Sequence, residues 1–85
     1  MTDPVPITVY RRQPCELCEE AIETIESTAD AAEIAVEIET VDVDSDPDLR
    51  EQYGDRVPVV AVDGREQFEL FVDETELIGV LRDAS

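Results

Sequence analysis

The sequence predicts an α/β domain in which a four-stranded mixed sheet is flanked by helices. The chain opens with a strand, a long helix and a second strand, an order that implies a right-handed crossover between two parallel strands. The dipeptide Asp63-Gly64 lies between two apolar stretches and favours a tight hairpin, which adds an antiparallel pair. A further helical pattern closes the chain, so the expected order of elements is β-α-β-α-β-β-α.

The first half of the chain supplies the crossover. Residues 6–10 alternate around two apolar side chains and predict the first strand. Residues 15–32 predict a helix, because small and apolar residues recur on one face at helical spacing. These residues are Cys18, Ala21, Ile22, Ile25, Ala29 and Ala32. Residues 36–43 predict the second strand, and a change of alternation near Thr40 indicates a β-bulge.

The second half of the chain supplies the other elements. Asp46, Pro47 and Gly54 suit the cap, the first position and the end of a short helix. The two strands of the hairpin and the last helix follow as residues 57–62, 65–71 and 73–83. Asp73 suits the N-cap of this last helix.

Length and charge limit the possible functions. A chain of 85 residues predicts a single domain over residues 1–85. Asp and Glu total 23 against 6 basic residues, all of them arginine, which gives a net charge of −17. Such a charge repels nucleic acid and anionic membranes, so neither is expected as a partner. Many carboxylates without any lysine resemble the proteins of halophilic archaea, with an ordinary acidic protein as the alternative.

The N-terminus and the apolar stretches indicate a cytoplasmic protein. No apolar run approaches the roughly 20 residues that a membrane helix needs. The first residues lack the basic start, apolar stretch and small-residue cleavage site of a secretory signal. We therefore expect a reducing compartment.

The only two cysteines, Cys15 and Cys18, lie three residues apart where the first helix is predicted to begin. Their sulfurs can approach each other on one helix face, but a bridge between them encloses too few residues to add much stability. The chain has no histidine, so a metal site would need carboxylates or a second chain. We favour a redox-active pair. A structural disulfide, a metal or cluster site shared by two chains, and an interaction protein with unreactive cysteines remain as alternatives.

The position of each cysteine on the helix predicts its role. Cys15 lies at the helix N-terminus, where unpaired N–H groups favour a thiolate, so we expect it to be exposed and to attack disulfides. Cys18 lies on the apolar face, so we expect it to be partly buried and to resolve the mixed disulfide. Arg11 and Arg12 favour the thiolate if their side chains turn towards it, whereas the neighbouring glutamates oppose it.

Three motifs resemble those of the glutaredoxin-like family of small thioredoxin-fold proteins. They are the C-x-x-C at the helix start, the D-x-D-x-D-P before the short helix, and Y-G-x-R-V-P-V followed by D-G. The resemblance covers roughly residues 6–82. Three positions differ from true glutaredoxins. Glu16-Leu17 replaces the usual Pro-Tyr, and Gln13-Pro14 lies where those enzymes often carry a lysine just upstream of the cysteines. Residues 71–75, FVDET, replace a Gly-Gly turn that helps those enzymes hold glutathione.

The resemblance also implies a function and a substrate-binding segment. A thiol–disulfide oxidoreductase is implied, without cofactor or metal, which reduces a disulfide-containing protein or a small-molecule disulfide. A reductase or a low-molecular-weight thiol would return the electrons, and we expect a monomer. The Val57–Pro58 bond is implied to be cis and to face the cysteines, with the Val57 backbone pairing with an extended substrate. Arg56 is interpreted either as an anchor for a substrate carboxylate or as a solvated charge.

Overall fold

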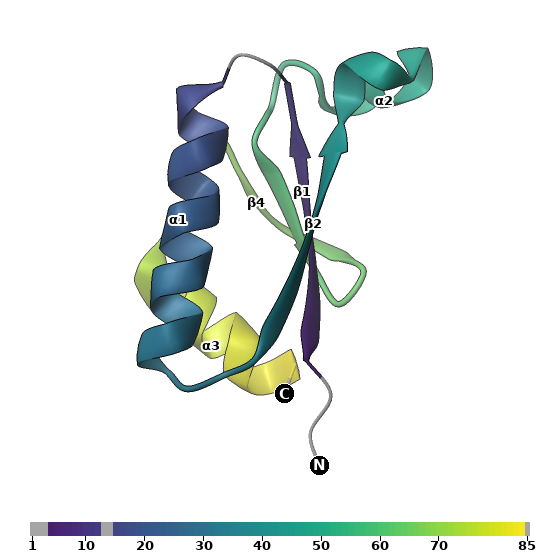
Figure 1. Ribbon diagram of the computed structural model, residues 1–85. Coiled ribbons are helices and arrows are strands. Elements are labelled where there is room, and N and C mark those ends of the chain that lie inside the picture. Colours follow the sequence, from purple (N-terminus) through teal and green to yellow (C-terminus); the bar gives the residue numbers. More distant parts are fainter. Residues whose placement is uncertain (1–3, 13–14, 85) are drawn as a thin grey trace.

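The computed structural model describes residues 4–12 and 15–84 and contains the predicted elements in the predicted order (Figure 1). They are β1 (Val5–Arg11), α1 (Glu16–Ala31), β2 (Val36–Asp42), a short 3₁₀ helix η1 (Val43–Ser45), α2 (Pro47–Tyr53), β3 (Val59–Val62), β4 (Arg65–Glu69) and α3 (Glu74–Ala84). The strand order in the sheet is β2-β1-β3-β4. β1 and β2 are parallel and the other neighbours are antiparallel, which confirms the predicted mixed sheet.

Helices α1 and α3 lie against the same face of the sheet, whereas α2 lies near the end of β2 (Figure 1). The hydrophobic core fills the space between the two long helices and the sheet. Its buried residues are Val5, Ile7, Val9, Ile25, Ala29, Val60, Val62, Phe68, Leu77 and Leu81. The helical spacing that predicted α1 and α3 therefore marks the faces that pack on the sheet.

The bulge expected near Thr40 is wrong, because β1 and β2 pair residue for residue along the whole of β2. The change in apolar alternation has another cause. Val41 pairs with Tyr10, whose ring stacks on that of Tyr53 with ring centroids 4.3 Å apart. Val41 therefore lies on the face of the sheet that α2 partly covers. The alternation changes for this reason, and no extra residue is inserted into β2.

An irregularity does occur in the hairpin. Val60 pairs with Phe68, and the next residue, Ala61, pairs with Glu66. Gln67 is therefore an extra residue in β4, which is the arrangement of a β-bulge. The bulge lets Phe68 face the core although the strand around it does not alternate regularly.

The predicted caps and turn are confirmed. Asp46 and Asp73 each accept, at 2.9 Å, the backbone N–H of the residue two positions further along the chain. Asp63 and Gly64 have φ angles of 53° and 81°, as a tight hairpin turn requires at both central positions.

Two glycines in helical segments predict opposite effects of alanine. A Cβ at Gly54 would overlap the carbonyl oxygen of Arg50, whereas a Cβ at Gly79 in α3 would meet only open space. Gly54→Ala is expected to lower the free energy of unfolding by about 1–3 kcal/mol through this clash. Gly79→Ala is expected to raise it by about 0.5–1 kcal/mol, because alanine restricts the unfolded chain. Urea unfolding of both variants measures the difference, and equal stabilities would contradict the packing described for Gly54.

Candidate active site

Cys15 and Cys18 form a disulfide bond at the start of α1, with their Cα atoms 5.2 Å apart. Cys15 is the N-cap residue of the helix and has extended backbone angles. Its Sγ accepts the backbone N–H of Cys18 at 3.1 Å, as the oxygen of an N-cap serine does. The same N–H is placed to stabilise a Cys15 thiolate once the disulfide is reduced.

The two sulfurs differ in their access to solvent. Cys15 is half-buried, which is less exposed than expected. Cys18 is completely buried, whereas partial burial was expected, because it lies on the face of α1 that packs on the sheet with Ala21 and Ile25. An incoming disulfide can therefore reach Cys15 and not Cys18 without movement of the helix.

The two neighbouring arginines point in different directions. Arg11 ends β1 on the same face as Val9, and its guanidinium lies 4.0 Å from the carboxylate of Glu19 in the first turns of α1. Its Nε is buried and has no hydrogen-bond partner among the residues that the structure describes. Arg12 instead donates from Nε to Asp44 at 3.3 Å. Only Arg11 thus turns towards the helical turn that holds the cysteines.

This difference predicts how fast Cys15 reacts. In the reduced protein, Arg11→Gln should slow alkylation of Cys15 by neutral iodoacetamide at pH 7 by about three- to tenfold, because a smaller fraction is thiolate without the nearby cation. Arg12→Gln is the control, because it also removes one positive charge but from an arginine that is paired with Asp44. We expect it to change the alkylation rate little. Equal effects of the two substitutions would contradict a specific role of Arg11.

The segment that enters β3 lies at the same end of the sheet as the cysteines (Figure 1). β3 is antiparallel to β1, and its first residue, Val59, pairs with Tyr10 near the end of β1. The preceding Val57–Pro58 bond is cis, as the resemblance implied, and Pro58 is buried.

The backbone of Val57 is open to a further strand. The N–H of Leu70 donates to the carbonyl oxygens on either side of it, Arg56 O at 3.2 Å and Pro58 O at 2.9 Å. Within residues 4–12 and 15–84, no hydrogen bond involves the N–H or the C=O of Val57 itself. This segment thus holds one residue, Val57, whose own backbone N–H and C=O can pair with a further strand.

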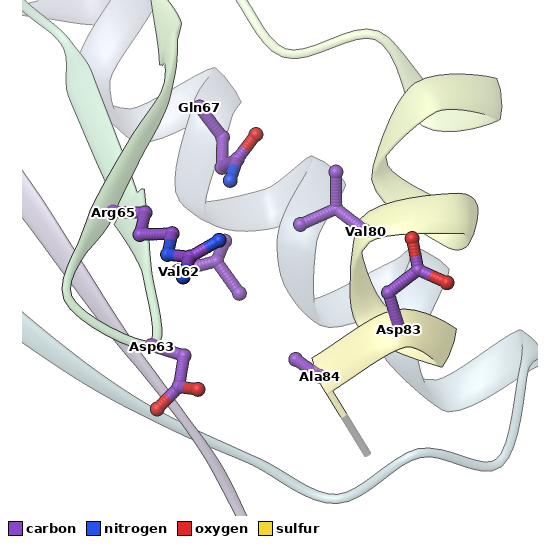
Figure 2. Close-up of a pocket in the computed structure, with 7 residues that line it drawn as sticks. All are labelled: Val62, Asp63, Arg65, Gln67, Val80, Asp83 and Ala84. Atoms are coloured by element: carbon purple, nitrogen blue, oxygen red, sulfur yellow. The ribbon is translucent and has the colours of Figure 1, made fainter.

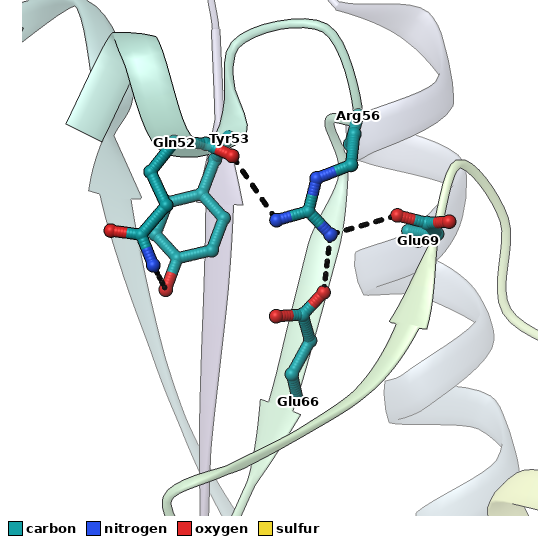
Figure 3. A network of polar contacts seen from close by, with 5 residues as sticks. All are labelled: Gln52, Tyr53, Arg56, Glu66 and Glu69. Atoms are coloured by element: carbon teal, nitrogen blue, oxygen red, sulfur yellow. Dashed lines mark hydrogen bonds and ion pairs between the residues drawn. The ribbon is translucent and has the colours of Figure 1, made fainter. Parts of the chain in front are cut away.

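Arg56 is paired with carboxylates of its own chain (Figure 3). The sequence had suggested either an anchor for a substrate carboxylate or a solvated charge, and neither interpretation includes this pairing. Its Nη1 donates to Glu66 and, at 2.8 Å, to Glu69, and its Nη2 donates to the carbonyl of Gln52 at 3.1 Å. The guanidinium also lies 5.4 Å from the centre of the Tyr53 ring. The hydrogen bonds that Arg56 donates to Glu69 and Glu66 raise its pKa above the usual value. The side chain therefore ties the segment before Pro58 to α2 and β4.

We call the contacts of Arg56 with Glu66, Glu69 and Gln52 the clamp. The β4 bulge makes this clamp possible. Glu66 pairs with Ala61 and Glu69 pairs with Val59, so the two glutamates lie on the same face of the sheet. In a regular strand, residues three positions apart point to opposite faces. The sequence offered no signal for the clamp, because strand alternation separates its two carboxylates.

The stacked rings of Tyr10 and Tyr53 have a packing role. Burial raises the pKa of Tyr10 above its usual value, and the neighbouring Tyr53 adds to the effect. The phenol therefore stays neutral at physiological pH.

A depression lies between the β3–β4 hairpin and the end of α3 (Figure 2). Its lining consists of Val62, Asp63, Arg65, Gln67, Val80, Asp83 and Ala84. The hairpin turn lies at the opposite end of β3 from Pro58, so this depression is separate from the cysteine site.

Two kinds of feature are not found in the described part of the chain. No group of three or more Cys, Asp or Glu side chains there is placed to hold a metal ion. No helix in the same residues has the length and apolar character needed to cross a membrane.

A mixed sheet of this order, with a C-x-x-C disulfide at a helix N-terminus and a cis-proline at the same end of the sheet, defines a thioredoxin-fold protein with a redox-type cysteine pair. Residues 6–82 match the family model of the glutaredoxin-like domain (DUF836). The chain belongs to this glutaredoxin-like family.

Similar proteins agree with this assignment. Uncharacterized proteins of Mycobacterium bovis and Mycobacterium tuberculosis are each 34% identical over 76 residues, which cover 84% of this chain and 76% of theirs. A structure from X. campestris is 32% identical with a TM-score of 0.76, covering 93% of this chain and 99% of its own. A mutant thioredoxin from Halobacterium salinarum is 25% identical with a TM-score of 0.58, covering 96% of this chain and 75% of its own. The curated relatives are mycobacterial, so they do not support the halophilic archaeal origin expected from the charge.

Proposed function

We propose that the protein is a thiol–disulfide oxidoreductase that uses Cys15 and Cys18 to reduce disulfides. One observation carries the proposal. The half-buried Sγ of Cys15 accepts a helix N-terminal N–H, while Cys18, within disulfide distance, is completely buried. This asymmetry suits one attacking and one resolving cysteine.

In the proposed reaction, the Cys15 thiolate attacks one sulfur of the substrate disulfide. The substrate S–S bond breaks, a mixed disulfide forms with Cys15, and the other substrate sulfur leaves as a thiolate that takes up a proton. The Cys18 thiol loses its proton and attacks Sγ of Cys15, which releases the second substrate thiol and forms the Cys15–Cys18 bond. Two electrons thus pass from the protein to the substrate.

The substrate is proposed to bind as an extended strand beside Val57. Its backbone would pair with the free N–H and C=O of Val57, as in other cases of strand addition. Pro58 removes an N–H donor from this position and shapes the turn into β3. Arg56 is proposed to position the segment through Glu66 and Glu69, and not to bind a substrate carboxylate directly.

The remaining parts of the proposal follow from this chemistry. The reaction needs no cofactor and no metal, since both electrons reside in the dithiol. A reductase or a low-molecular-weight thiol would reduce the pair again, in a cytoplasm that keeps thiols reduced. The protein is proposed to act as a single-domain monomer.

The proposal is tested on protein purified without oxygen. Elemental analysis and thiol counting should find both thiols free and no stoichiometric metal, and the reduced protein should reduce one equivalent of a small neutral disulfide such as hydroxyethyl disulfide. One metal ion or cluster per one or two chains, with both thiols blocked, would favour the shared metal site. Free thiols that leave the disulfide intact would favour an interaction protein with unreactive cysteines.

A further inference from the structure

Exposed apolar side chains gather at the end of the molecule that holds the cysteines. Leu17, Leu70 and Phe71 are the large hydrophobic residues with exposed side chains in the described part of the chain, at 51%, 47% and 68% exposure. Leu17 lies between the two cysteines. Leu70 and Phe71 follow β4, which ends beside the start of β3 because these strands are antiparallel. We call these three residues the apolar rim.

The backbone holds the apolar rim in place. Leu70 has a φ angle of 71°, an unfavourable conformation for a residue with a Cβ atom. Its N–H is shared by the carbonyls of Arg56 and Pro58, and the N–H of Phe71 donates to Glu69 O at 2.9 Å. A fixed, strained segment that displays two apolar side chains to solvent indicates a surface used for contact.

Carboxylates surround the apolar rim. The exposed acidic residues in its neighbouring segments are Glu16, Glu19, Glu20, Glu69, Asp73 and Glu74. The three arginines in the segments that flank the cysteines are each paired with carboxylates of this chain. These pairs are Arg11 with Glu19, Arg12 with Asp44, and Arg56 with Glu66 and Glu69. The segments at this end of the molecule therefore expose apolar side chains together with an excess of negative charge.

We propose that the substrate is a protein or peptide disulfide whose cysteine lies in an extended segment with an apolar neighbour and flanking lysines or arginines. The inference rests on the proposed function and specifies its substrate class. The apolar neighbour packs on Leu17 and Phe71, while the cations face carboxylates such as Glu16 and Glu20. Small anionic disulfides such as oxidised glutathione are repelled by the same carboxylates and find no unpaired arginine in these flanking segments.

The test compares disulfide peptides that differ only in charge. Two cyclic peptides share one disulfide and one aromatic neighbour, and carry either lysine or glutamate on both sides. The prereduced wild-type protein should reduce the lysine peptide on the order of tenfold faster than the glutamate peptide at low ionic strength. The difference should shrink in about 1 M KCl, where the Debye length falls to about 3 Å. Oxidised glutathione should behave like the glutamate peptide.

Two pairs of measurements show whether the preference depends on the carboxylates and the apolar rim near the cysteines, and not on a change of charge or of reactivity anywhere in the protein. Glu20→Lys should reduce the preference for the lysine peptide. Glu37→Lys makes the same charge change near the start of β2, at the end of the sheet away from the cysteines, and should leave the preference unchanged. Phe71→Ser should slow the reduction of both peptides by about three- to tenfold, as the loss of a packed aromatic contact does, and leave the reduction of hydroxyethyl disulfide unaffected.

Equal rates of reduction of both peptides, with hydroxyethyl disulfide still reduced, overturn the substrate class alone. If hydroxyethyl disulfide is not reduced, the proposed function fails.

Discussion

Replacing Cys15 by serine is expected to abolish disulfide reduction, by a factor on the order of 10³ or more, because the attacking group is lost and the remaining sulfur is buried. Replacing Cys18 by serine has a different expected result. Cys15 keeps its place at the N-cap of α1 and the N–H of residue 18, so it still attacks. Without a second thiol the reaction stops at the mixed disulfide, and one substrate half stays bound to the protein.

Mass spectrometry of the intact protein distinguishes the two variants after exposure to a disulfide substrate. Cys18→Ser should carry one adduct per chain, released by a thiol reductant, and Cys15→Ser should carry none. The double variant is the control for non-specific labelling. An adduct on Cys18 in the Cys15→Ser variant, without one on Cys15 in the other, would reverse the roles assigned to the two cysteines.

The stability of the protein is expected to rise steeply with salt. The exposed face of α1 carries three like-charge pairs at i,i+4 spacing, Glu16/Glu20, Glu19/Glu23 and Glu26/Asp30. Each pair is unfavourable by roughly 0.2–0.5 kcal/mol at low ionic strength, so screening of these three alone adds about 1 kcal/mol to the free energy of unfolding. The net charge of −17 adds further repulsion over the whole surface.

Urea unfolding between dilute buffer and about 2 M KCl measures this dependence. A variant with Glu16→Gln, Glu23→Gln and Glu26→Gln removes one member of each pair and should respond less steeply, which separates screening from general salt effects. A midpoint that barely moves in the wild-type protein would mean that the carboxylates are tolerated without screening.

Much of the fold could be predicted from the sequence because its signals are local. The apolar spacing of α1 is the spacing of the residues that pack on the sheet, and Asp63-Gly64 adopts the φ angles that its turn requires. The parallel pairing of β1 with β2 and the antiparallel pairing of β3 with β4 followed from the order of these elements. The predicted bulge near Thr40 was wrong, because the alternation of apolar and polar residues also changes where the apolar side chains of a strand switch from one covered face of the sheet to the other.

The candidate site was predictable only where a short motif defines it. Cys15 caps α1 three residues before Cys18, so the approach of the two sulfurs follows from the helical period. Their unequal burial follows from the apolar face of the helix, which includes Cys18 and not Cys15. The clamp around Arg56 depends on the β4 bulge, and the left-handed conformation of Leu70 depends on two carbonyls from another loop. These features arise from contacts between distant segments, which the periodicity of a single segment does not encode.

The central claim is that Cys15 and Cys18 form a reversible dithiol–disulfide couple. Equilibration of the protein in a series of dithiol redox buffers, followed by alkylation of free thiols and mass measurement, tests it directly. We expect one two-electron transition without bound metal, at a potential between about −270 and −120 mV, where thioredoxin-fold redox proteins operate. A pair that stays oxidised below about −350 mV, as a purely structural disulfide does, would contradict the account.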